Sequence, residues 1–392
     1  MNEQDLRDLF TVSVRDVLPT APAAAGWERA RRTRRTRRAI GAVVVAVALA
    51  SGAAVALRPS ADSRLEHPVA PTVEPTHAGP VQRPPAKLTF PPDPLSRISG
   101  PPTVALSARP VQRALALFQP LNEEGQPDGP IRILGDDGVV RSLDVVTPAP
   151  TWDESGNEAT AVKPGVLSPD GRWAAFAQTN ELIMVDLTTA GVRRVPLDGY
   201  LELVVWAQDR VLVGGDNRAY VVERDTEAAS TTKVSAWNVV APDPEAGRGA
   251  AVLELVGEWG GLKLRSRTAF DGAVRSEQRI TMGALPPPYQ VNEFYGRGWL
   301  HGGRLASAAW IVNSQIDGAE GVAVLDSRTG VVTHLLDLGR DRAKGCCPVY
   351  GWDNKGAVLL RLEPAGLARW DPETGTITGI IDNLRGVLAL AG

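Results

Sequence analysis

The sequence is poor in the side chains that bind metals or act as nucleophiles. Its 392 residues include only two cysteines and four histidines. The cysteines, Cys346 and Cys347, are adjacent, so they cannot supply the spaced thiolates of a zinc site. We interpret them as free thiols in a turn, with a vicinal disulfide as the alternative in an oxidising compartment. His301, beside Gly302, is interpreted as a turn residue, and His334, in an apolar run, as a structural histidine.

Catalytic motifs are absent as well. The sequence contains no Gly-x-Ser-x-Gly elbow, no His-Glu-x-x-His pair and no phosphate-binding glycine loop. Asp136-Asp137 precedes a glycine, which predicts a hairpin turn, and Asp153-Glu154 begins a polar loop with weak calcium potential. The sequence identifies no nucleophile and no base, so we expect no catalytic residues, no metal and no cofactor.

Lysine is scarce, with six residues among the 42 basic ones, and the formal net charge of -3 is unevenly distributed. Residues 1–38 contain nine arginines and five acidic residues, whereas the remainder contains 33 basic and 40 acidic residues. A nucleic-acid-binding domain would carry its basic residues on the folded body. The charge distribution therefore argues against a nucleic-acid partner.

One segment is long and free of charge. Ala39 to Leu57 contains 19 uncharged residues, and as a helix it would span about 28 Å, close to the hydrocarbon core of a membrane. Seven arginines precede it between Arg29 and Arg38. By the positive-inside rule, this predicts a single-pass protein of the cell membrane with a cytoplasmic N-terminus and residues 58–392 outside.

A cleavable signal is the alternative to this anchor. Ala54-Val55-Ala56 offers small residues at cleavage spacing, and the paired arginines suit a twin-arginine signal. The 38 residues before the apolar segment are long for such a signal, which favours an uncleaved anchor. Small residues also share one face of the predicted helix, which suggests a weak dimer through it; they are Ala42, Ala46, Ala50 and Ala54.

Residues 1–38 are too few to form a core. Apolar residues recur there at helical spacing up to Pro19, which predicts a short amphipathic helix. Its candidate contacts for a cytoplasmic protein are Leu6, Leu9, Phe10, Val14 and Val17. With the arginine run and the Ala/Val-rich helix, the segment resembles the cytoplasmic ends of some bacterial membrane regulators of extracytoplasmic-function sigma factors. The alternative is a topology signal with a frayed helix.

Arg58 to Pro102 contains 12 prolines in 45 residues and few large apolar side chains. Such a segment cannot bury enough surface to fold and adopts an extended, polyproline-like chain. It would reach on the order of 100 Å. We therefore predict that residues 58–102 are a disordered stalk that holds the following domain away from the membrane.

From Thr103 onward, short apolar runs alternate with turn sequences, which predicts an all-β domain over residues 103–392. The stretch LSPDGRWAAFAQTNELIMVDLTTAG, residues 167–191, contains two such runs. Its second half recurs in outline as AYVVERDTEA, VAVLDSRTG and LARWDPETG. Each copy has an aspartate that we expect to accept hydrogen bonds in its turn; these are Asp186, Asp225, Asp326 and Asp371.

The spacing of these copies is typical of β-propeller blades of about 40 to 50 residues. LSPDGRWAAFA followed by LIMVDLTTAG resembles a blade of the TolB-type, WD-repeat-like propellers, which implies that architecture for the whole domain. Val387 to Ala391 is expected to pair with the first blade and close the ring. The six predicted blades are residues 103–147, 160–197, 200–236, 237–284, 288–338 and 347–384. The alternatives are seven blades and a pair of β-sandwiches.

A propeller fold does not by itself select a function. The segment PPPYQVNEFYGRGW, residues 286–299, is predicted to be a loop rich in the residue types that form binding hot spots. The candidate partner-binding residues are Tyr289, Phe294, Tyr295, Arg297 and Trp299. The structural alternative is that these side chains close the gap between two blades.

Together these features favour a membrane-anchored, extracytoplasmic propeller that binds or senses a protein, a peptide or a cell-wall component without catalysis. One alternative is a propeller hydrolase or lyase, in which acidic residues meet His301 or His334 at the central channel. The other alternative is a transmembrane regulator of a sigma factor that works through the cytoplasmic helix.

Overall fold

The computed structural model describes residues 79–391, except for 216–217, 237–238, 244–250, 259–260, 269–270, 284, 313–317, 341–347 and 363–365. The predicted cytoplasmic helix and membrane helix, the first part of the stalk and the two cysteines lie outside the described residues. In the part of the chain that the structure describes, no helix is both long and apolar enough to cross a membrane.

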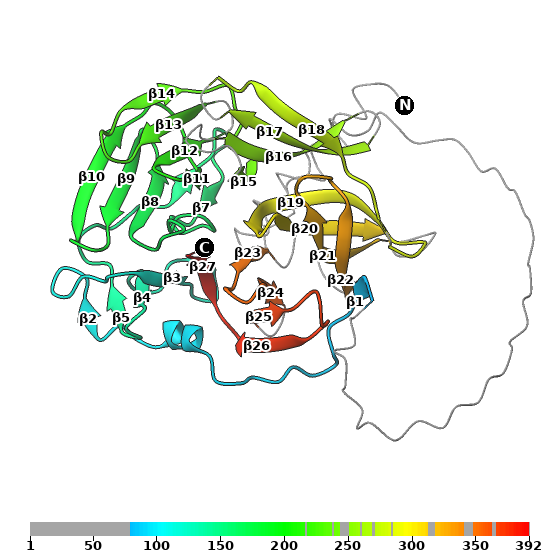
Figure 1. Cartoon of the computed structure of the whole chain (residues 1–392). Coiled ribbons are helices and arrows are strands. Elements are labelled where there is room, and N and C mark those ends of the chain that lie inside the picture. Colours follow the sequence, from blue (N-terminus) through cyan, green and yellow to red (C-terminus); the bar gives the residue numbers. More distant parts are fainter. Residues whose placement is uncertain are drawn as a thin grey trace, which may run out of the picture.

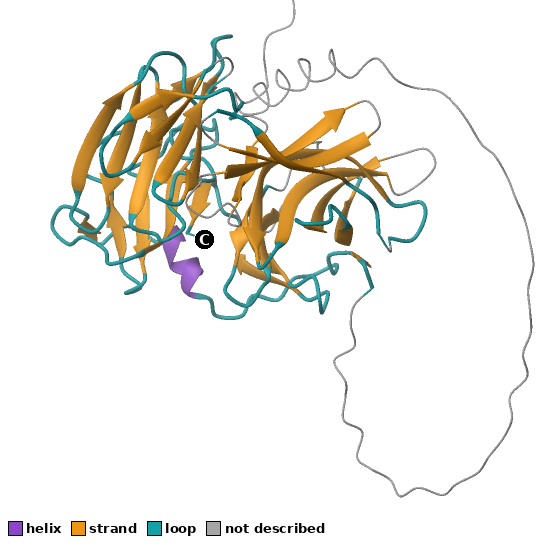
Figure 2. Ribbon diagram, turned by 45° about the horizontal axis from the view of Figure 1, so that its top comes forward, coloured by secondary structure: helices purple, strands orange, loops and turns teal. Residues whose placement is uncertain are grey.

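Six sheets are arranged in a ring around one axis, and each sheet is one blade (Figures 1 and 2). Blade 1 consists of β2 (Val104–Ala105), β3 (Ala114–Pro120), β4 (Arg132–Gly135), β5 (Val140–Ser142) and β27 (Gly386–Leu390). Blade 2 consists of β8 (Trp173–Gln178), β9 (Glu181–Asp186) and β10 (Gly191–Pro196). Blade 3 consists of β11 (Leu203–Ala207), β12 (Arg210–Gly214), β13 (Ala219–Glu223) and β14 (Ala229–Thr231).

The second half of the ring has the same antiparallel pattern. Blade 4 consists of β15 (Val239–Asp243), β16 (Ala251–Glu258), β17 (Gly261–Thr268) and β18 (Val274–Arg279). Blade 5 consists of β1 (Val81–Gln82), β19 (Gln290–His301), β20 (Arg304–Val312), β21 (Gly318–Asp326) and β22 (Val332–Gly339). Blade 6 consists of β23 (Val349–Trp352), β24 (Val358–Leu362), β25 (Gly366–Trp370) and β26 (Ile377–Ile381). A separate hairpin joins β6 (Thr151–Trp152) to β7 (Glu158–Ala159), and η1 (Pro94–Ser99) is a short 3-10 helix.

The prediction of a six-bladed propeller is confirmed, because each predicted blade contains one of these sheets. The prediction of ring closure is also confirmed. β27 pairs antiparallel with β3, from Gly386 opposite Pro120 to Leu390 opposite Ala116. The last strand of the chain therefore completes the first blade, and the alternative of two β-sandwiches is wrong.

The strands are apolar runs because both faces of most blades are covered by their neighbours. In β8, all six residues are buried. Phe176 packs with Leu117 in the core between blades 1 and 2. Trp173, on the opposite face, packs with Trp206 in the core between blades 2 and 3. A strand buried on both sides reads as a continuous apolar run rather than an alternating one.

The repeated aspartates hold the turns in three of the four copies. Asp186 accepts from the backbone N–H of Thr188 at 2.9 Å, and Asp326 accepts from that of Thr329 at 2.8 Å. Asp371 accepts from the N–H of Glu373 at 2.9 Å. Asp225 differs, because its carboxylate binds the guanidinium of Arg224 instead. The predicted role is confirmed for the first three residues and wrong for Asp225.

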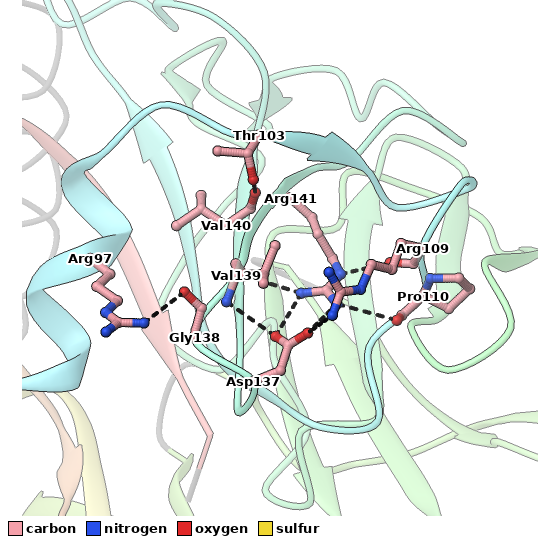
Figure 3. A network of polar contacts seen from close by, with 9 residues as sticks. All are labelled: Arg97, Thr103, Arg109, Pro110, Asp137, Gly138, Val139, Val140 and Arg141. Atoms are coloured by element: carbon pink, nitrogen blue, oxygen red, sulfur yellow. Dashed lines mark hydrogen bonds and ion pairs between the residues drawn. The ribbon is translucent and has the colours of Figure 1, made fainter.

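The turn between β4 and β5 contains a charged network (Figure 3). The guanidinium of Arg141, which is only 1% exposed, donates to both carboxylate oxygens of Asp137, at 3.0 and 2.8 Å. Arg109 donates to the same carboxylate at 3.1 Å. The hydrogen bonds from Arg141 hold the pKa of Asp137 at about 2, below its ordinary value. The predicted hairpin turn at Asp136-Asp137 is therefore confirmed, and its second carboxylate neutralises a buried arginine.

Residues 79–102 differ from the predicted disordered stalk. They lie along the outer rim of blades 5, 6 and 1, where β1 adds a parallel strand to β22 and β2, which follows directly after these residues, adds one to β5. The prolines keep this segment extended, as expected, but apolar side chains between them are buried; Ile98, for example, is completely buried in the core between blades 6 and 1. We call residues 79–105 the strap.

Candidate functional site

The centre of the ring is formed by the innermost strand of each blade, among them β11, β15, β19, β23 and β27 (Figure 1). Three charged residues from different parts of the chain lie near one another there. Lys163 comes from the segment that leads into blade 2, Glu202 directly precedes β11, and Arg297 is on β19. We call these three residues the central cluster.

Arg297 reaches across the ring. Its Nη1 donates to the backbone carbonyl of Val204 on β11 of blade 3, and also to that of Pro164, at 3.5 Å. Its guanidinium lies over the ring of Trp299, 4.8 Å from the centroid. A cation over an indole face is attracted by the ring quadrupole. One side chain of blade 5 thus connects the inner wall of three blades.

Gly165 leaves the space that Arg297 occupies. A Cβ at this position would collide with the guanidinium of Arg297 and would lie 2.9 Å from the carbonyl oxygen of Val204. The φ of Gly165 is +99°, a conformation that other residues rarely adopt. Both the backbone angle and the lack of a side chain are therefore needed for the arginine to cross the centre.

The environment of Arg297 disfavours the positive charge of its guanidinium, because the side chain is shielded from water. Burial lowers the pKa of Arg297 to about 10. Its Nε is buried and has no hydrogen-bond acceptor among the described residues. Buried polar groups are almost always paired with protein, water or ligand. This N–H is therefore an exception to that rule within the described residues.

Lys163 and Glu202 lie beside the segment that Arg297 contacts. The Nζ of Lys163 is 3.7 Å from a carboxylate oxygen of Glu202, whose side chain is 1% exposed. Lys163 also donates to the hydroxyl of Thr151 on β6 at 2.8 Å. This contact connects the cluster to the β6–β7 hairpin, which carries Trp152 with 42% of its surface exposed.

The composition of the central cluster limits its chemistry. Two cations and one carboxylate can hold an anionic group by charge-assisted hydrogen bonds. Among the residues described, no three His, Cys, Asp or Glu side chains gather closely enough to hold a metal ion. The arrangement is suited to binding an oxyanion such as a carboxylate.

The predicted aromatic loop is a strand for most of its length, so that part of the prediction is wrong. Residues 290–301 form β19, interrupted by a bulge between Tyr295 and Trp299. The alternation of apolar residues was obscured by this bulge, because Gly296 and Gly298 shift the register.

The five predicted partner-binding residues are distributed over four environments. Phe294 and Trp299 are each 8% exposed and belong to the cores on the two sides of blade 5. The hydroxyl of Tyr295 donates to the buried carboxylate of Glu320 at 2.5 Å. Tyr289 contacts the strap, where its hydroxyl accepts a hydrogen bond from Arg83 at 3.0 Å. Arg297 is the predicted residue that lies in the central cluster.

The two histidines lie in different places in blade 5. His301 ends β19 and stacks on Trp352, with ring centroids 5.8 Å apart. His334 is on the outer strand β22, where its Nδ1 is 3.1 Å from the hydroxyl of Thr333. Burial lowers the pKa of His334. The structure therefore does not bring these histidines together at the centre of the ring.

Lys163, Glu202 and Gly165 were missed by the sequence analysis. Each stands alone in its segment, and none is part of a motif. The one available signal was a lysine and a glutamate at the ends of two segments that connect blades, in a chain with only six lysines. Segments that connect blades end at the innermost strands, which is where a central site must form.

The fold and the central cluster define a six-bladed β-propeller with a charged centre. No family model matches the chain, and no curated protein matches it. Among solved structures, it is similar to a chain of a nidogen/laminin complex, with 10% identity and a TM-score of 0.44 over 71% of this chain and 98% of that one. It is also similar to TolB from Acinetobacter baumannii, with 14% identity and a TM-score of 0.45 over 70% of this chain and 65% of that one. BamB from Moraxella catarrhalis matches with 12% identity and a TM-score of 0.36 over 68% of this chain and 87% of that one. At these identities and TM-scores, the likeness implies no shared ligand.

Proposed function

We propose that the protein is a membrane-anchored, extracytoplasmic propeller that acts as a non-catalytic binding and sensing module. Its ligand is a protein, a peptide or a cell-wall component that presents a carboxylate to the central cluster. The observation that carries this proposal is the position of Arg297, whose buried Nε has no acceptor within the described residues.

The geometry around Arg297 favours an anionic ligand. Its Nη1 is held by two backbone carbonyls, which fixes the orientation of the planar guanidinium. A fixed guanidinium presents its remaining N–H groups in a geometry that matches a carboxylate. Because the side chain is already ordered, binding costs little additional side-chain entropy.

In this proposal, residues 39–57 anchor the protein with its N-terminus in the cytoplasm, and residues 58–78 are the stalk. The stalk is shorter than the sequence analysis predicted, because the strap belongs to the propeller. The small-residue face of residues 39–57 would support a weak dimer, and the cytoplasmic helix would contact a protein inside the cell.

The test is a crosslinking pull-down on the intact protein in its own membrane. Wild type is compared with Arg297→Gln and with Arg218→Gln, a matched control whose side chain is 56% exposed in a surface ion pair. We expect partners that are captured by wild type and by the control but lost with Arg297→Gln. Capture of the same partners by all three proteins would contradict the proposal.

The ligand chemistry is tested separately with two probes of opposite charge. A polyglutamate peptide is titrated into the wild-type protein in a calorimeter, and polylysine of equal length is the control. We expect saturable binding of polyglutamate that weakens about tenfold or more with Arg297→Gln, as for loss of one charged hydrogen bond. Binding of polylysine alone, or equal binding by the variant, would contradict a carboxylate site.

A further inference from the structure

The strap covers the outer edges of three consecutive blades. Val81 and Gln82 pair in parallel with Leu335 and Leu336 of β22 in blade 5. The carbonyl of Thr89 then accepts from the N–H of Gly379 on β26 of blade 6, at 2.8 Å. Finally, β2 pairs in parallel with β5 of blade 1. Figure 1 shows this segment passing along the rim from β1, beside β26, to β2.

The covered and uncovered edges differ in character. β26 reads Ile-Thr-Gly-Ile-Ile, and Leu335 and Leu336 of β22 are completely buried. The uncovered edges belong to β10, β14 and β18. β10 contains two arginines and a proline, β14 has three exposed residues, and β18 reads Val-Arg-Ser-Glu-Gln-Arg. Charge, proline and short length are the devices that protect open edges from pairing with other chains. The edges of blades 5 and 6 lack these devices and are protected by the strap.

The first half of the strap is recognised by specific contacts with blades 5 and 6. The side chain of Gln82 donates to the carbonyl of Pro372 at 2.6 Å and accepts from the indole N–H of Trp370 at 2.5 Å. The ring of Phe90 lies where a Cβ on Gly379 would be. Asp93 forms an ion pair with Arg369 at 2.8 Å. Backbone pairing combined with side-chain recognition is how a sheet edge binds an extended peptide.

The connection between this half and the rest of the fold favours exchange. Pro91 and Pro92 are exposed and separate residues 79–90 from η1, which packs on blades 6 and 1. Prolines keep a released segment extended rather than collapsed. When two copies exchange such a segment, each forms the contacts that it had within one chain, so the exchange is energetically inexpensive.

We propose that the outer edge of blades 5 and 6 is a docking site for an extended segment of the sequence 79–90, and that its partner is the strap of a second copy of this chain. Within one chain the site is occupied by the chain's own strap. At high local concentration, two copies exchange straps and form a closed dimer in which both rings remain intact. This dimer is independent of the central cluster and of the membrane helix.

The test uses the full chain and a labelled synthetic peptide of residues 79–90. Gln82→Ala in the protein weakens its own strap, whereas the peptide keeps Gln82. We expect the peptide to bind this variant at least about tenfold more tightly than it binds wild type, since two hydrogen bonds now favour the peptide. A peptide carrying Gln82→Ala should lose this advantage. The control protein is Glu277→Ala, altered on the uncovered β18, which should behave as wild type.

Exchange between copies is measured by mixing full chains that carry two different affinity tags. We expect mixed dimers to accumulate with protein concentration and to increase with Gln82→Ala, as measured by pull-down and by light scattering. The proposal is overturned if the peptide does not bind the variant, or if mixed dimers never form although proteolysis shows that the strap has opened.

If Gln82→Ala does not fold, a measurement on the wild-type protein tests the proposal instead. Hydrogen exchange reports the free energy at which each segment opens. We expect the amides of β1 and of Leu335, which donates to the carbonyl of Pro80 at 2.7 Å, to exchange faster than those of β21. Exchange of all these amides at one rate, through global unfolding alone, would mean that the strap does not open and would refute the proposal.

Discussion

The indole N–H of Trp370 donates to the side-chain carbonyl of Gln82 at 2.5 Å, across 288 residues of sequence. Trp370 is completely buried, and Gln82 is 8% exposed. The hydrogen bond joins the strap to blade 6 and satisfies a polar group that would otherwise be buried without a partner. The strap is therefore part of the folded domain and not an appendage to it.

Gln82→Ala is expected to destabilise the protein by about 2 to 3 kcal/mol, because it leaves the buried indole N–H without an acceptor. Urea unfolding followed by tryptophan fluorescence measures this change. The control is Gln126→Ala, at an exposed position between β3 and β4, which should change the free energy of unfolding by less than about 0.5 kcal/mol. Equal effects of the two substitutions would mean that the strap contributes nothing to stability.

The free energy of unfolding is expected to fall at low pH because the carboxylate of Asp137 becomes protonated. Its pKa in the folded protein is about 2, below the ordinary value of 3.8. A lowered pKa contributes stability that is fully present above the ordinary value and is lost as the pH falls from about 4 to 2. Because Asp137 is 34% exposed, solvent screening limits the contribution to about 1 kcal/mol.

Asp137→Asn is the variant that tests this assignment. It should lower stability at neutral pH by about 2 to 3 kcal/mol, because Arg141 stays buried and loses its countercharge. The loss of stability between pH 4 and 2 should become correspondingly smaller. Asp136→Asn, at the adjacent exposed position, is the control and should retain the wild-type pH profile. A variant at Asp137 with an unchanged profile would show that another group titrates.

The turn aspartates are expected to differ in importance although their sequences are alike. Asp326→Ala should cost about 1 to 2 kcal/mol, because its carboxylate accepts from two backbone N–H groups and from the Thr329 hydroxyl. Asp225→Ala should cost less than about 0.5 kcal/mol, since this carboxylate is 67% exposed and binds a surface arginine. Thermal unfolding of both variants measures the difference, and a larger effect at Asp225 would contradict the structure.

Gly165→Ala is expected to disturb the centre of the ring. The new Cβ would meet the guanidinium of Arg297 and adopt an unfavourable φ, which together should cost about 2 to 4 kcal/mol. Gly125→Ala is the matched control, because its φ is +80° and nothing lies near its Cβ; it should cost about 1 kcal/mol.

The double variant Gly165→Ala with Arg297→Ala separates collision from backbone strain. Removing the guanidinium should make the effect of Gly165→Ala similar to that of the Gly125 control. Chemical denaturation of the four proteins measures this coupling. If the cost of Gly165→Ala is the same with and without Arg297, then the two residues do not compete for the same space.

The blades could be predicted from sequence because their signals are local. A turn such as Asp170-Gly171 and the buried run that follows it lie within ten residues, and both belong to one hairpin. The strap was misjudged for a physical reason. Its proline content is typical of a disordered chain, and the side chains that hold it, such as Gln82, find their partners almost 300 residues away.

The central cluster could not be predicted from the sequence for the same reason. Arg297 was identified as a candidate from its aromatic surroundings, but its bonds to Val204 and Pro164 span 93 and 133 residues. Nothing near Gly165 in the sequence indicates that a guanidinium will pass over it. Long-range contacts of this kind depend on the closed ring, which local patterns do not describe.

The pairing of β27 with β3 has a consequence for the order in which the chain is assembled. During synthesis from the N-terminus, β3 and the strap appear early, whereas β22, β26 and β27 appear late. The first blade must wait for its innermost strand, and the strap must wait for the edges that it covers. Residues 81–90 and β3 therefore appear early but find these partners late, and a nascent chain stopped just before residue 386 would present the inner edge of β3 unpaired to its surroundings.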